Sequence, residues 1–358
     1  MADGLCPRKA ASGIPAAAGG GGRSMSDRPL RVALFGAGLI STYHLRAWAA
    51  QGVPVVAICD PIREKAEAKA REFGIPAIFT DPKALFAAGG FELADIAASV
   101  DAHDPLTRMA ADHGIHVLLQ KPMTRTVAEA EALIAYVGER VRFMVHENYR
   151  FRPHYMTVRR WIAEGRIGRP RHASMTVRGS GLCPRPGAEP FLLERQPYLK
   201  GFHRNLVFET MIHHLDVLRL LVGPLQVVAA RLNRLAEGLP GEDTASILLE
   251  GPGGLIATAD GCIAAPGYPP LHGDRLEIVG TEGTVVMDYN RVFLVGQEDG
   301  AEEVDLLGRY QECFDTTMGE FLRGVREDAP FETDRLDNLE TLRLMEAVYL
   351  AAGMEVMQ

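Results

Sequence analysis

The chain contains 358 residues, of which 47% are hydrophobic and 23% are charged, and it carries a formal net charge of −8. This length accommodates two ordinary domains, and the composition is that of a soluble globular protein. The negative charge argues against a nucleic-acid partner, since such proteins usually carry a basic patch, and no apolar stretch approaches the roughly 20 residues of a membrane span. The five cysteines are scattered without CxxC spacing, which predicts a reducing, cytoplasmic environment and no thiolate metal site.

Residues 1–28 are set apart from the rest by their composition. The stretch "AASGIPAAAGGGGRS" is rich in alanine and glycine, so we expect this N-terminal extension to be disordered. It lacks the long apolar segment of a secretory signal, and Met25 offers a second start of translation. The remaining chain is predicted to form two domains, over 29–147 and 148–358.

The first predicted elements are a strand, a tight glycine turn, a helix and a second strand. Alternating apolar residues over 30–38 run into glycine, the next stretch, 39–52, has helical spacing, and 53–60 is typical of a buried strand. Gly36 permits the turn, and Gly38 lets the backbone approach a pyrophosphate at the helix N-terminus. This arrangement predicts a dinucleotide-binding site.

An acidic residue strengthens that prediction. Asp60 ends the second strand, 22 residues after Gly38, which is close to the ~20-residue spacing of the carboxylate that binds the adenosine ribose. A carboxylate there repels a 2′-phosphate and favours NAD, while Arg63 nearby keeps NADP as the alternative. Ser41 takes the third small position, where glycine or alanine is usual. The plainer interpretation, a turn that binds nothing, is outweighed because spacing, strand context and acid coincide.

Strands and short helices continue to alternate up to about residue 147, which predicts a parallel, doubly wound sheet of the Rossmann type. Ligands bind such sheets at the carboxyl ends of the strands. Gln120 and Lys121 lie at the end of one predicted strand, and Pro122 keeps Lys121 extended. We therefore expect Lys121 to point into the cofactor cleft. The alternative is a lysine that reaches from a strand end to water.

After residue 147 the pattern changes to a helix followed by several strand-like segments, some joined by short turns such as "GPGG" and "TEG". This predicts an α+β domain with a large, mostly antiparallel sheet. The segments "ASILLE", "LIATA" and "TVVMD" carry more apolar side chains than one covered face needs. We therefore expect a homodimer or homotetramer that buries the second face of this sheet.

One predicted helix of this half, over 205–223, carries groups suited to chemistry. Glu209 and His213 lie four residues apart on one face, and Asp216 follows near that face. A carboxylate beside an imidazole suits proton transfer. The residue types also suit a metal, but His213 and His214 point ~100° apart and cannot easily share one, so no metal is expected. The alternative is that His213 has only a structural role, with a carboxylate as its partner.

Taken together, these motifs resemble the Gfo/Idh/MocA family, named for glucose-fructose oxidoreductase and inositol dehydrogenase. The resemblance covers about residues 30–355. The segment "GAGLI" corresponds to the family's glycine turn, Asp60 to its ribose-binding acid, and "QKP" to its Glu-Lys-Pro signature. Its Asp-x-x-x-His helix is found here as Glu209-x-x-x-His213. Glutamine in the signature and glutamate in the helix depart from the family pattern, and suggest a subgroup with its own substrate geometry.

The resemblance implies an NAD-dependent dehydrogenase, an oxidoreductase that acts on CH–OH groups of a polyhydroxylated carbohydrate such as an inositol, a sugar or a sugar acid. In the family, the lysine of the signature reaches the substrate hydroxyl beside the nicotinamide. Lys121 would therefore hydrogen-bond that hydroxyl, and His213 would accept its proton as hydride leaves for NAD. Glu209 would orient His213 or hold a neighbouring hydroxyl.

The complete predicted site has a cofactor part and a substrate part. The cofactor-binding residues are Gly36, Gly38, Leu39, Ile40, Asp60, Ser99, Gln120 and Lys121. The substrate-binding residues are Lys121, Asn148, Arg150, Arg204, Glu209 and His213, and further candidates are Arg152, Arg185, Tyr198, Lys200 and His203.

Two other functions are compatible with the same fold. One is a glycosidase or lyase that retains NAD and uses transient oxidation to labilise a bond. The other is a non-catalytic regulator that senses a sugar or NAD. The presence of Lys121 and His213 argues against the regulator, and net turnover of added NAD would separate the dehydrogenase from the glycosidase or lyase.

Overall fold

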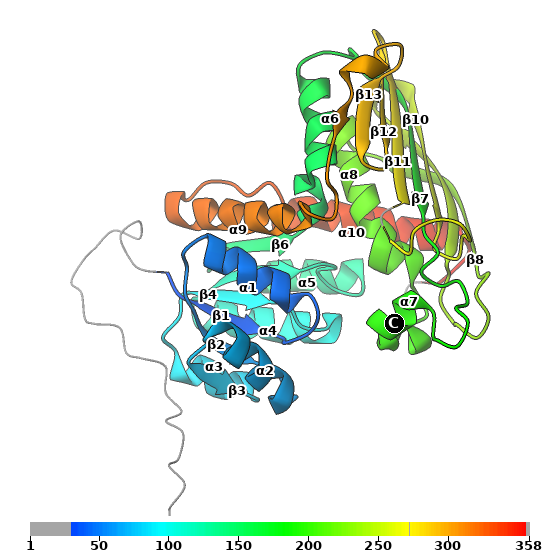
Figure 1. Ribbon diagram of the computed structural model, residues 1–358. Helices are drawn as coiled ribbons and strands as arrows, with labels where there is room; N and C mark the ends of the chain where they lie inside the picture. The colour runs from blue at the N-terminus through cyan, green and yellow to red at the C-terminus, as the bar shows by residue number, and fades with distance from the viewer. Residues whose placement is uncertain (1–29, 272, 356–358) are drawn as a thin grey trace, which may run out of the picture. The chain divides into compact units, whose positions relative to one another are not determined.

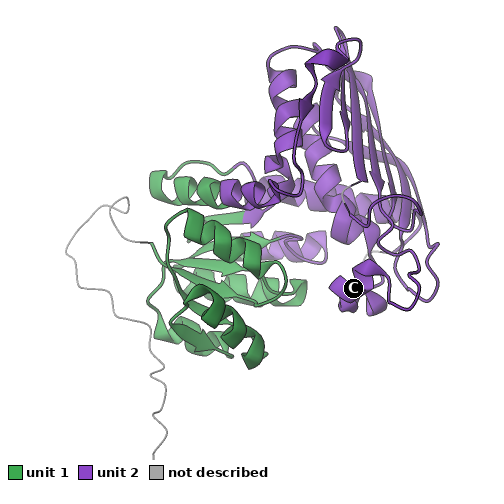
Figure 2. Cartoon of the chain, viewed as in Figure 1, with its two compact units in different colours: residues 1–120, 135–144, 318–331 green, residues 121–134, 145–317, 332–358 purple. Residues whose placement is uncertain are grey.

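The computed structural model describes residues 30–271 and 273–355, so the prediction made for 1–28 lies outside the described residues. The described chain divides into two compact units (Figure 2). Unit 1 comprises the residues up to Gln120 with 135–144 and 318–331, and unit 2 comprises 121–134, 145–317 and the chain from Glu332 onward. The division differs from the two contiguous domains that the sequence predicts, because segments distant in sequence complete each core.

Unit 1 is built on β1 (Val32–Phe35), β2 (Val55–Cys59), β3 (Ala77–Phe79), β4 (Leu93–Ile96), β5 (His116–Gln120) and the first half of β6 (Phe143–His146). They form one sheet with the order β3-β2-β1-β4-β5-β6 (Figure 1). Neighbours from β3 to β5 pair in parallel. The strands are nearly continuous apolar runs, as expected where helices cover both faces. The predicted doubly wound Rossmann architecture is confirmed.

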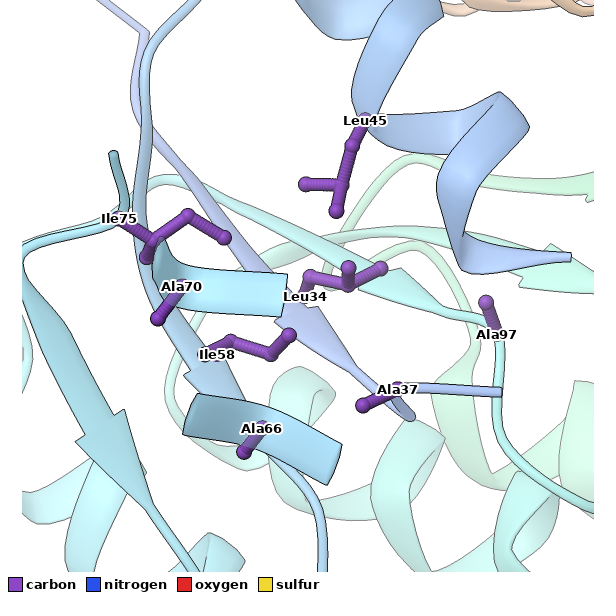
Figure 3. Packing of buried hydrophobic residues seen from close by; sticks show 8 residues of the cluster. All are labelled: Leu34, Ala37, Leu45, Ile58, Ala66, Ala70, Ile75 and Ala97. Atoms are coloured by element: carbon purple, nitrogen blue, oxygen red, sulfur yellow. The ribbon is translucent and has the colours of Figure 1, made fainter. Parts of the chain in front are cut away.

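The helices of unit 1 are α1 (Ser41–Ala50), α2 (Arg63–Phe73), α3 (Pro82–Ala88) and α4 (Val100–Asp112), with the C-terminal parts of α5 (Val127–Val137) and α9 (Tyr310–Glu327). Buried side chains of α1 and α2 pack against Leu34 and Ile58 on one face of the sheet (Figure 3). Successive strand residues point to opposite faces. Phe35 therefore lies on the other face, where its ring stacks on Phe86 of α3 with centroids 5.0 Å apart.

A segment from far along the chain completes this core. The indole of Trp48 in α1 is fully buried and meets the ring of Phe321 edge-on, with centroids 6.4 Å apart. Phe331 stacks on Phe321 at 5.7 Å, and the guanidinium of Arg142 lies 4.5 Å above the Phe331 ring. All four residues belong to unit 1, so 318–331 is part of its core.

Unit 2 contains β7 (Pro170–Arg178), β8 (Gln226–Asn233), β9 (Thr244–Gly251), β10 (Leu255–Cys262), β11 (Gly273–Gly280), β12 (Thr284–Asp288), β13 (Arg291–Leu294) and β14 (Glu302–Glu303). They form a sheet with the order β14-β13-β12-β11-β7-β10-β9-β8 (Figure 1). Every pairing is antiparallel except that of β7 with β10. The predicted large, mostly antiparallel sheet is confirmed.

Three helices of unit 2 pack on this sheet: α6 (Pro153–Ala163) contacts β12 and β13, α8 (Ile212–Val222) contacts β7, and α10 (Arg335–Ala351) contacts β8. Val228, Leu248 and Ile256 expose 54%, 37% and 52% of their surface. The sequence also predicted exposed apolar side chains in "TVVMD". The apolar residues of that segment, which forms β12, are buried, so they add nothing to the exposed apolar surface formed by Val228, Leu248 and Ile256.

The helix predicted over 205–223 consists of two parts. Leu206–Met211 forms a π-helical turn, and α8 begins only at Ile212. Glu209 therefore lies in the wider turn and His213 in the first turn of α8. A pattern read with 3.6 residues per turn cannot reveal this, and such π-turns inside helices occur frequently at functional sites.

Two kinds of feature are missing from residues 30–271 and 273–355. No helix there has both the length and the apolar character needed to cross a membrane. No three histidine, cysteine or acidic side chains gather there in an arrangement that would hold a metal ion.

Candidate active site

The glycine turn after β1 has the shape that a dinucleotide requires. Gly36 has a φ of +101°, and a Cβ added to it would lie 2.5 Å from the carbonyl oxygen of Ala97. Only glycine fits there. A Cβ at Gly38 would meet nothing within 4 Å, so that residue is not made small by protein packing. Its missing side chain leaves open space beside the turn, as the close approach of a pyrophosphate needs.

The helix that follows the turn presents its N-terminus without a side-chain cap. The N-cap residue of α1, Ile40, makes no capping hydrogen bond, and the hydroxyl of Ser41 donates to the carbonyl oxygen of Gly38 at 2.6 Å. Leu39 is about half exposed. Amide groups at an uncapped helix N-terminus favour an anion. The first turn of α1 therefore fits the phosphates of a dinucleotide.

Asp60 lies at the carboxyl end of β2, against the same turn. Its Oδ2 accepts a hydrogen bond from the amide of Ala37 at 2.8 Å, and its Oδ1 accepts one from the amide of Ile62 at 2.8 Å. A carboxylate has about four acceptor positions, so these two bonds fix its orientation and leave capacity for two ribose hydroxyls. Together with the turn and the helix, this donor and acceptor set fits NAD.

Two further predicted cofactor residues lie at neighbouring strand ends of unit 1. Ser99 is exposed at the start of α4 and makes no side-chain capping bond. Gln120 is buried at the end of β5, and its side-chain nitrogen lies 3.1 Å from Nε2 of His44. Nδ1 of His44 is in turn 2.9 Å from the buried carboxylate of Asp95. The amide of Gln120 is therefore held by a histidine on α1, a partner that the motif pattern did not indicate.

Lys121 begins unit 2, where its ammonium group meets Glu209. Nζ of Lys121 donates to the backbone carbonyl of Glu209 at 2.8 Å and lies 3.5 Å from its carboxylate. The hydroxyl of Tyr198 is hydrogen-bonded to the same carboxylate. The Lys121 and Glu209 side chains keep 14% and 17% of their surface accessible. Two of the three predicted catalytic residues, Lys121 and Glu209, are therefore in contact, with the half-exposed Tyr198 beside them.

The partner of His213 is a residue that the sequence did not indicate. Nδ1 of His213 lies 2.5 Å from Oε1 of Glu147, which is completely buried. The ring of Tyr149 stacks on the imidazole with centroids 4.0 Å apart and planes 7° apart. The prediction that Glu209 orients His213 therefore needs correction, because Glu209 pairs with Lys121 and Glu147 with His213. No spacing rule links Glu147 to the helix, so only the folded chain reveals the contact.

Burial shifts the protonation of both members of this pair. It raises the pKa of the Glu147 carboxyl to about 8, and the charge of Asp216 adds to the increase. It also lowers the pKa of His213 well below the usual value, with the positive charge of Lys121 as the next cause. Both shifts favour neutral groups at neutral pH. Perturbed, paired groups of this kind are typical of catalytic sites.

The adjacent histidine has a different environment. Nδ1 of His214 is hydrogen-bonded to the carbonyl of Thr210 at 3.1 Å, and its Nε2 lies 3.2 Å from the carboxylate of Asp274. Burial alone would raise the pKa of Asp274, but His214 and Arg152 hold it below its usual range. The two histidines thus use separate carboxylates, as their divergent directions on a helix require.

Three predicted substrate residues are committed to the protein interior. The guanidinium of Arg150 donates to Asp216 at 2.6 and 2.8 Å, to Asp337 and to the Glu332 carbonyl. The amide of Asn148 donates to the sulfur of Cys313 at 3.1 Å. We assign both residues a structural role in place of the predicted substrate contact, because a buried charge requires partners of its own.

The third is Arg204, which is 3% exposed. Its guanidinium lies 4.2 Å above the ring of Tyr349 and donates to the carbonyl of Glu355 at 2.5 Å. It therefore packs against Tyr349 and Glu355. The lysine and arginine candidates farther out are paired on the surface, Lys200 with Glu189 and Arg185 with Glu194, at 2.7 and 2.6 Å.

Comparisons with known proteins give matches over most of the chain. Residues 30–148 match the model of the Gfo/Idh/MocA oxidoreductase family, NAD-binding Rossmann fold, and residues 155–286 match a C-terminal domain of the same family. The chain is 30% identical over 334 residues to D-apiose dehydrogenase of Paraburkholderia graminis, covering 89% of this chain and 87% of that protein. It is 28% identical over 335 residues to inositol 2-dehydrogenase of Rhizobium meliloti, covering 89% and 95%.

A solved structure extends the likeness to three dimensions. An oxidoreductase from Agrobacterium radiobacter, in complex with NAD+, L-tartaric acid and magnesium, superimposes with a TM-score of 0.84 at 28% identity. The match covers 91% of this chain and 97% of that one.

Proposed function

The chain belongs to the Gfo/Idh/MocA family of NAD-binding oxidoreductases, and from that membership we propose that it is a dehydrogenase of a polyhydroxylated carbohydrate. The substrate class is an inositol, a sugar or a sugar acid. The observation that carries the proposal is the accessible Lys121–Glu209 pair beside a buried imidazole, with Lys121 directly following Gln120 of β5 along the chain.

The relatives support this substrate class. Their names give D-apiose and inositol as substrates, and the Agrobacterium radiobacter structure contains L-tartaric acid. All three molecules carry at least two hydroxyls on adjacent carbons. An ammonium group, a carboxylate and a tyrosine hydroxyl, as found in Lys121, Glu209 and Tyr198, are suitable hydrogen-bond partners for such a molecule.

Lys121, His213 and Glu209 would each have a separate role in oxidation of the alcohol group. NAD, when bound, takes a hydride from the alcohol carbon. Lys121 donates a hydrogen bond to the substrate oxygen and stabilises the negative charge that develops there. His213 accepts the hydroxyl proton through Nε2, since Nδ1 is held by Glu147. Glu209 keeps Lys121 in place and accepts a hydrogen bond from a neighbouring hydroxyl.

The direct test is a panel of polyols, aldoses and sugar acids incubated with NAD, with NADH formation followed by absorbance. We expect sustained production of NADH with at least one member of the panel. NADH that stops at one equivalent per enzyme, while a glycosidic or other bond is cleaved, would instead identify a glycosidase or lyase that retains its cofactor.

The enzyme should use NAD in preference to NADP. The Asp60 carboxylate is oriented by two backbone amides and would repel a 2′-phosphate, and an unfavourable interaction of ~1.4 kcal/mol already corresponds to a tenfold difference. We expect kcat/KM to be at least about tenfold higher with NAD than with NADP. The variant Asp60→Ser should reduce this preference for NAD. The matched control is Glu64→Ser, which removes an exposed acid in the first turn of α2. This variant should keep the wild-type preference for NAD. A wild-type preference for NADP would contradict the role of Asp60.

The protein should form a stable homodimer or homotetramer through the unit 2 sheet. Val228, Leu248 and Ile256 are exposed large apolar residues on adjoining strands, and clusters of this kind usually mark interfaces. Light scattering at micromolar concentration should give a mass of two or four chains. Ile256→Glu should shift the distribution toward smaller species, whereas Leu350→Glu, at a similarly exposed position on α10, should not. A monomeric wild type would refute this interface.

A further inference from the structure

We propose that Glu147 is a positioning residue of the reaction, whose carboxylate holds His213 in the tautomer that leaves Nε2 free to accept the substrate proton. This inference rests on the proposed function, in which His213 is the proton acceptor. It concerns a residue to which the sequence analysis assigned no role, because Glu147 follows β6 and lies far from α8 in the sequence.

The geometry fixes the imidazole in two ways. Tyr149 stacks on the ring at 4.0 Å and is itself covered by the guanidinium of Arg152 at 4.6 Å, so the plane of the ring is set by stacking. The 2.5 Å contact between Nδ1 and Oε1 of Glu147 then sets the rotation within that plane. Because Nδ1 faces Glu147, Nε2 is the nitrogen that remains for the substrate.

The carboxylate itself is held by its own surroundings. Oε1 of Glu147 also accepts the amide of Tyr149 at 3.2 Å, which caps the short helix Asn148–Phe151. Just before it, Val145 is tied to Thr333 by hydrogen bonds of 3.0 and 2.6 Å. Oε2 is buried and has no hydrogen-bond partner within the described residues. Within the described residues, the hydrogen-bond partners of the Glu147 side chain are therefore the Tyr149 amide and the imidazole that it orients.

Several charged groups act on the pair. Lys121 and Arg150 oppose the rise in the pKa of Glu147, whereas burial and Asp216 produce it, with a result of about 8. His214 and Arg152, together with Lys121, lower the pKa of His213 further below the value set by burial, and Asp216 acts in the opposite direction. These shifts favour the neutral form of His213 and bring the titration of Glu147 toward the neutral pH range.

The protonation of Glu147 decides which ring nitrogen carries the proton. Below about pH 8 the carboxyl O–H donates to Nδ1, the imidazole proton sits on Nε2, and Nε2 cannot accept another. Above that pH the carboxylate accepts Nδ1–H, and the lone pair of Nε2 is available. In the oxidation, the hydroxyl proton would then move to Nε2 and the electron pair of the O–H bond would form the carbonyl, while NAD, when bound, would supply the acceptor for the hydride of the alcohol carbon.

The variant Glu147→Gln separates this role from a structural one. The amide of Tyr149 needs an acceptor at the position of Oε1, so the glutamine carbonyl should take that position and accept Nδ1–H at every pH. We expect the rise of kcat with pH near 8 to disappear. We also expect the value of kcat at high pH to fall, because the negative charge that supports the imidazolium is lost. This decrease should be smaller than the ~10²- to 10⁴-fold effect of removing the base itself. Glu147→Asp keeps a titrating carboxyl and should keep the rise at a lower plateau.

The matched control is Glu242→Gln. Glu242 is another buried glutamate of unit 2 whose pKa is raised by burial, and it accepts from the amides of Asn205 and Val207 and from the hydroxyl of Tyr349. It has no contact with His213, so its variant should keep the wild-type pH midpoint. A loss of the midpoint in both variants would overturn the proposal, since burial alone would then explain it.

A second measurement does not depend on whether Glu147→Gln folds. Ring ¹⁵N shifts of His213 in the wild-type protein, assigned by their loss in His213→Ala, should change from the Nε2–H to the Nδ1–H tautomer between about pH 6.5 and 9.5. A ring that keeps one tautomer throughout would overturn the role of Glu147. Failure of the proposed function is distinguishable, because it would leave His213→Ala active, whereas failure of this inference leaves His213→Ala inactive and Glu147→Gln with wild-type rate and midpoint.

Discussion

Replacing His213 with alanine should lower turnover by roughly 10²- to 10⁴-fold, the usual contribution of a positioned acid or base. The removal of a hydride from an alcohol is difficult unless the hydroxyl proton also leaves, and His213 is the imidazole of the cluster that is oriented by a buried carboxylate. The NAD dissociation constant should be unchanged, because the glycine turn and Asp60 belong to unit 1. Turnover and cofactor affinity are therefore measured on the same preparation.

The control for this variant is His113→Ala, which removes an exposed histidine beyond α4 and should keep wild-type turnover. A His213→Ala enzyme that turns over its substrate at a near-normal rate would leave the proposed mechanism without its base. Unfolding is monitored by thermal denaturation, since removal of the ring also removes the stacking partner of Tyr149.

Replacing Lys121 with methionine should lower turnover by about 10²- to 10³-fold, as expected when one donor to a developing oxyanion is removed. Methionine is similar in length to the apolar part of the lysine side chain, and its thioether does not need the hydration that an ammonium group loses in a site only 14% exposed. The Glu209 carboxylate loses its ion-pair partner but keeps the hydrogen bond to Tyr198, so we expect the melting temperature to change little. A loss of activity that accompanies unchanged or higher stability points to chemistry, not to damage.

The comparison for this variant is Lys83→Met at an exposed position of α3, which should leave both turnover and stability unchanged. If Lys121→Met retained wild-type turnover, the ammonium group would have no part in stabilising the alkoxide. If its KM rose while kcat stayed constant, the lysine would bind the substrate and its transition state equally.

The sequence was most informative where the chemistry is local. The two glycines and Asp60 form one strand–turn–helix–strand unit, so their spacing alone predicts their proximity. Lys121 could be singled out because a proline ends its strand. In contrast, Glu147 reaches His213 only through packing of segments 66 residues apart, and nothing in its neighbourhood has a fixed spacing to α8.

Other differences have equally specific causes. The π-helical turn at Leu206–Met211 leaves no mark on an apolar pattern read at 3.6 residues per turn. The structural role of Arg150 had one visible signal, since Asp216 lies among apolar residues of the same helix and a buried carboxylate requires a cationic partner. That pairing could have been predicted, whereas the choice of Arg150 over other arginines could not.

The distribution of unit 1 along the chain has a consequence for how the protein is made. Trp48 is among the first residues of its core, but Phe321, which packs against it, and Phe331, which stacks on Phe321, come from the segment 318–331. During vectorial synthesis the nucleotide-binding sheet is thus translated long before the aromatic residues that complete its core leave the ribosome. Domains usually fold in order of synthesis, but here the core of the N-terminal unit is complete only when nearly the whole polypeptide has been made. A fragment cut at the apparent domain boundary, near residue 147, would expose the indole of Trp48 and be prone to aggregation.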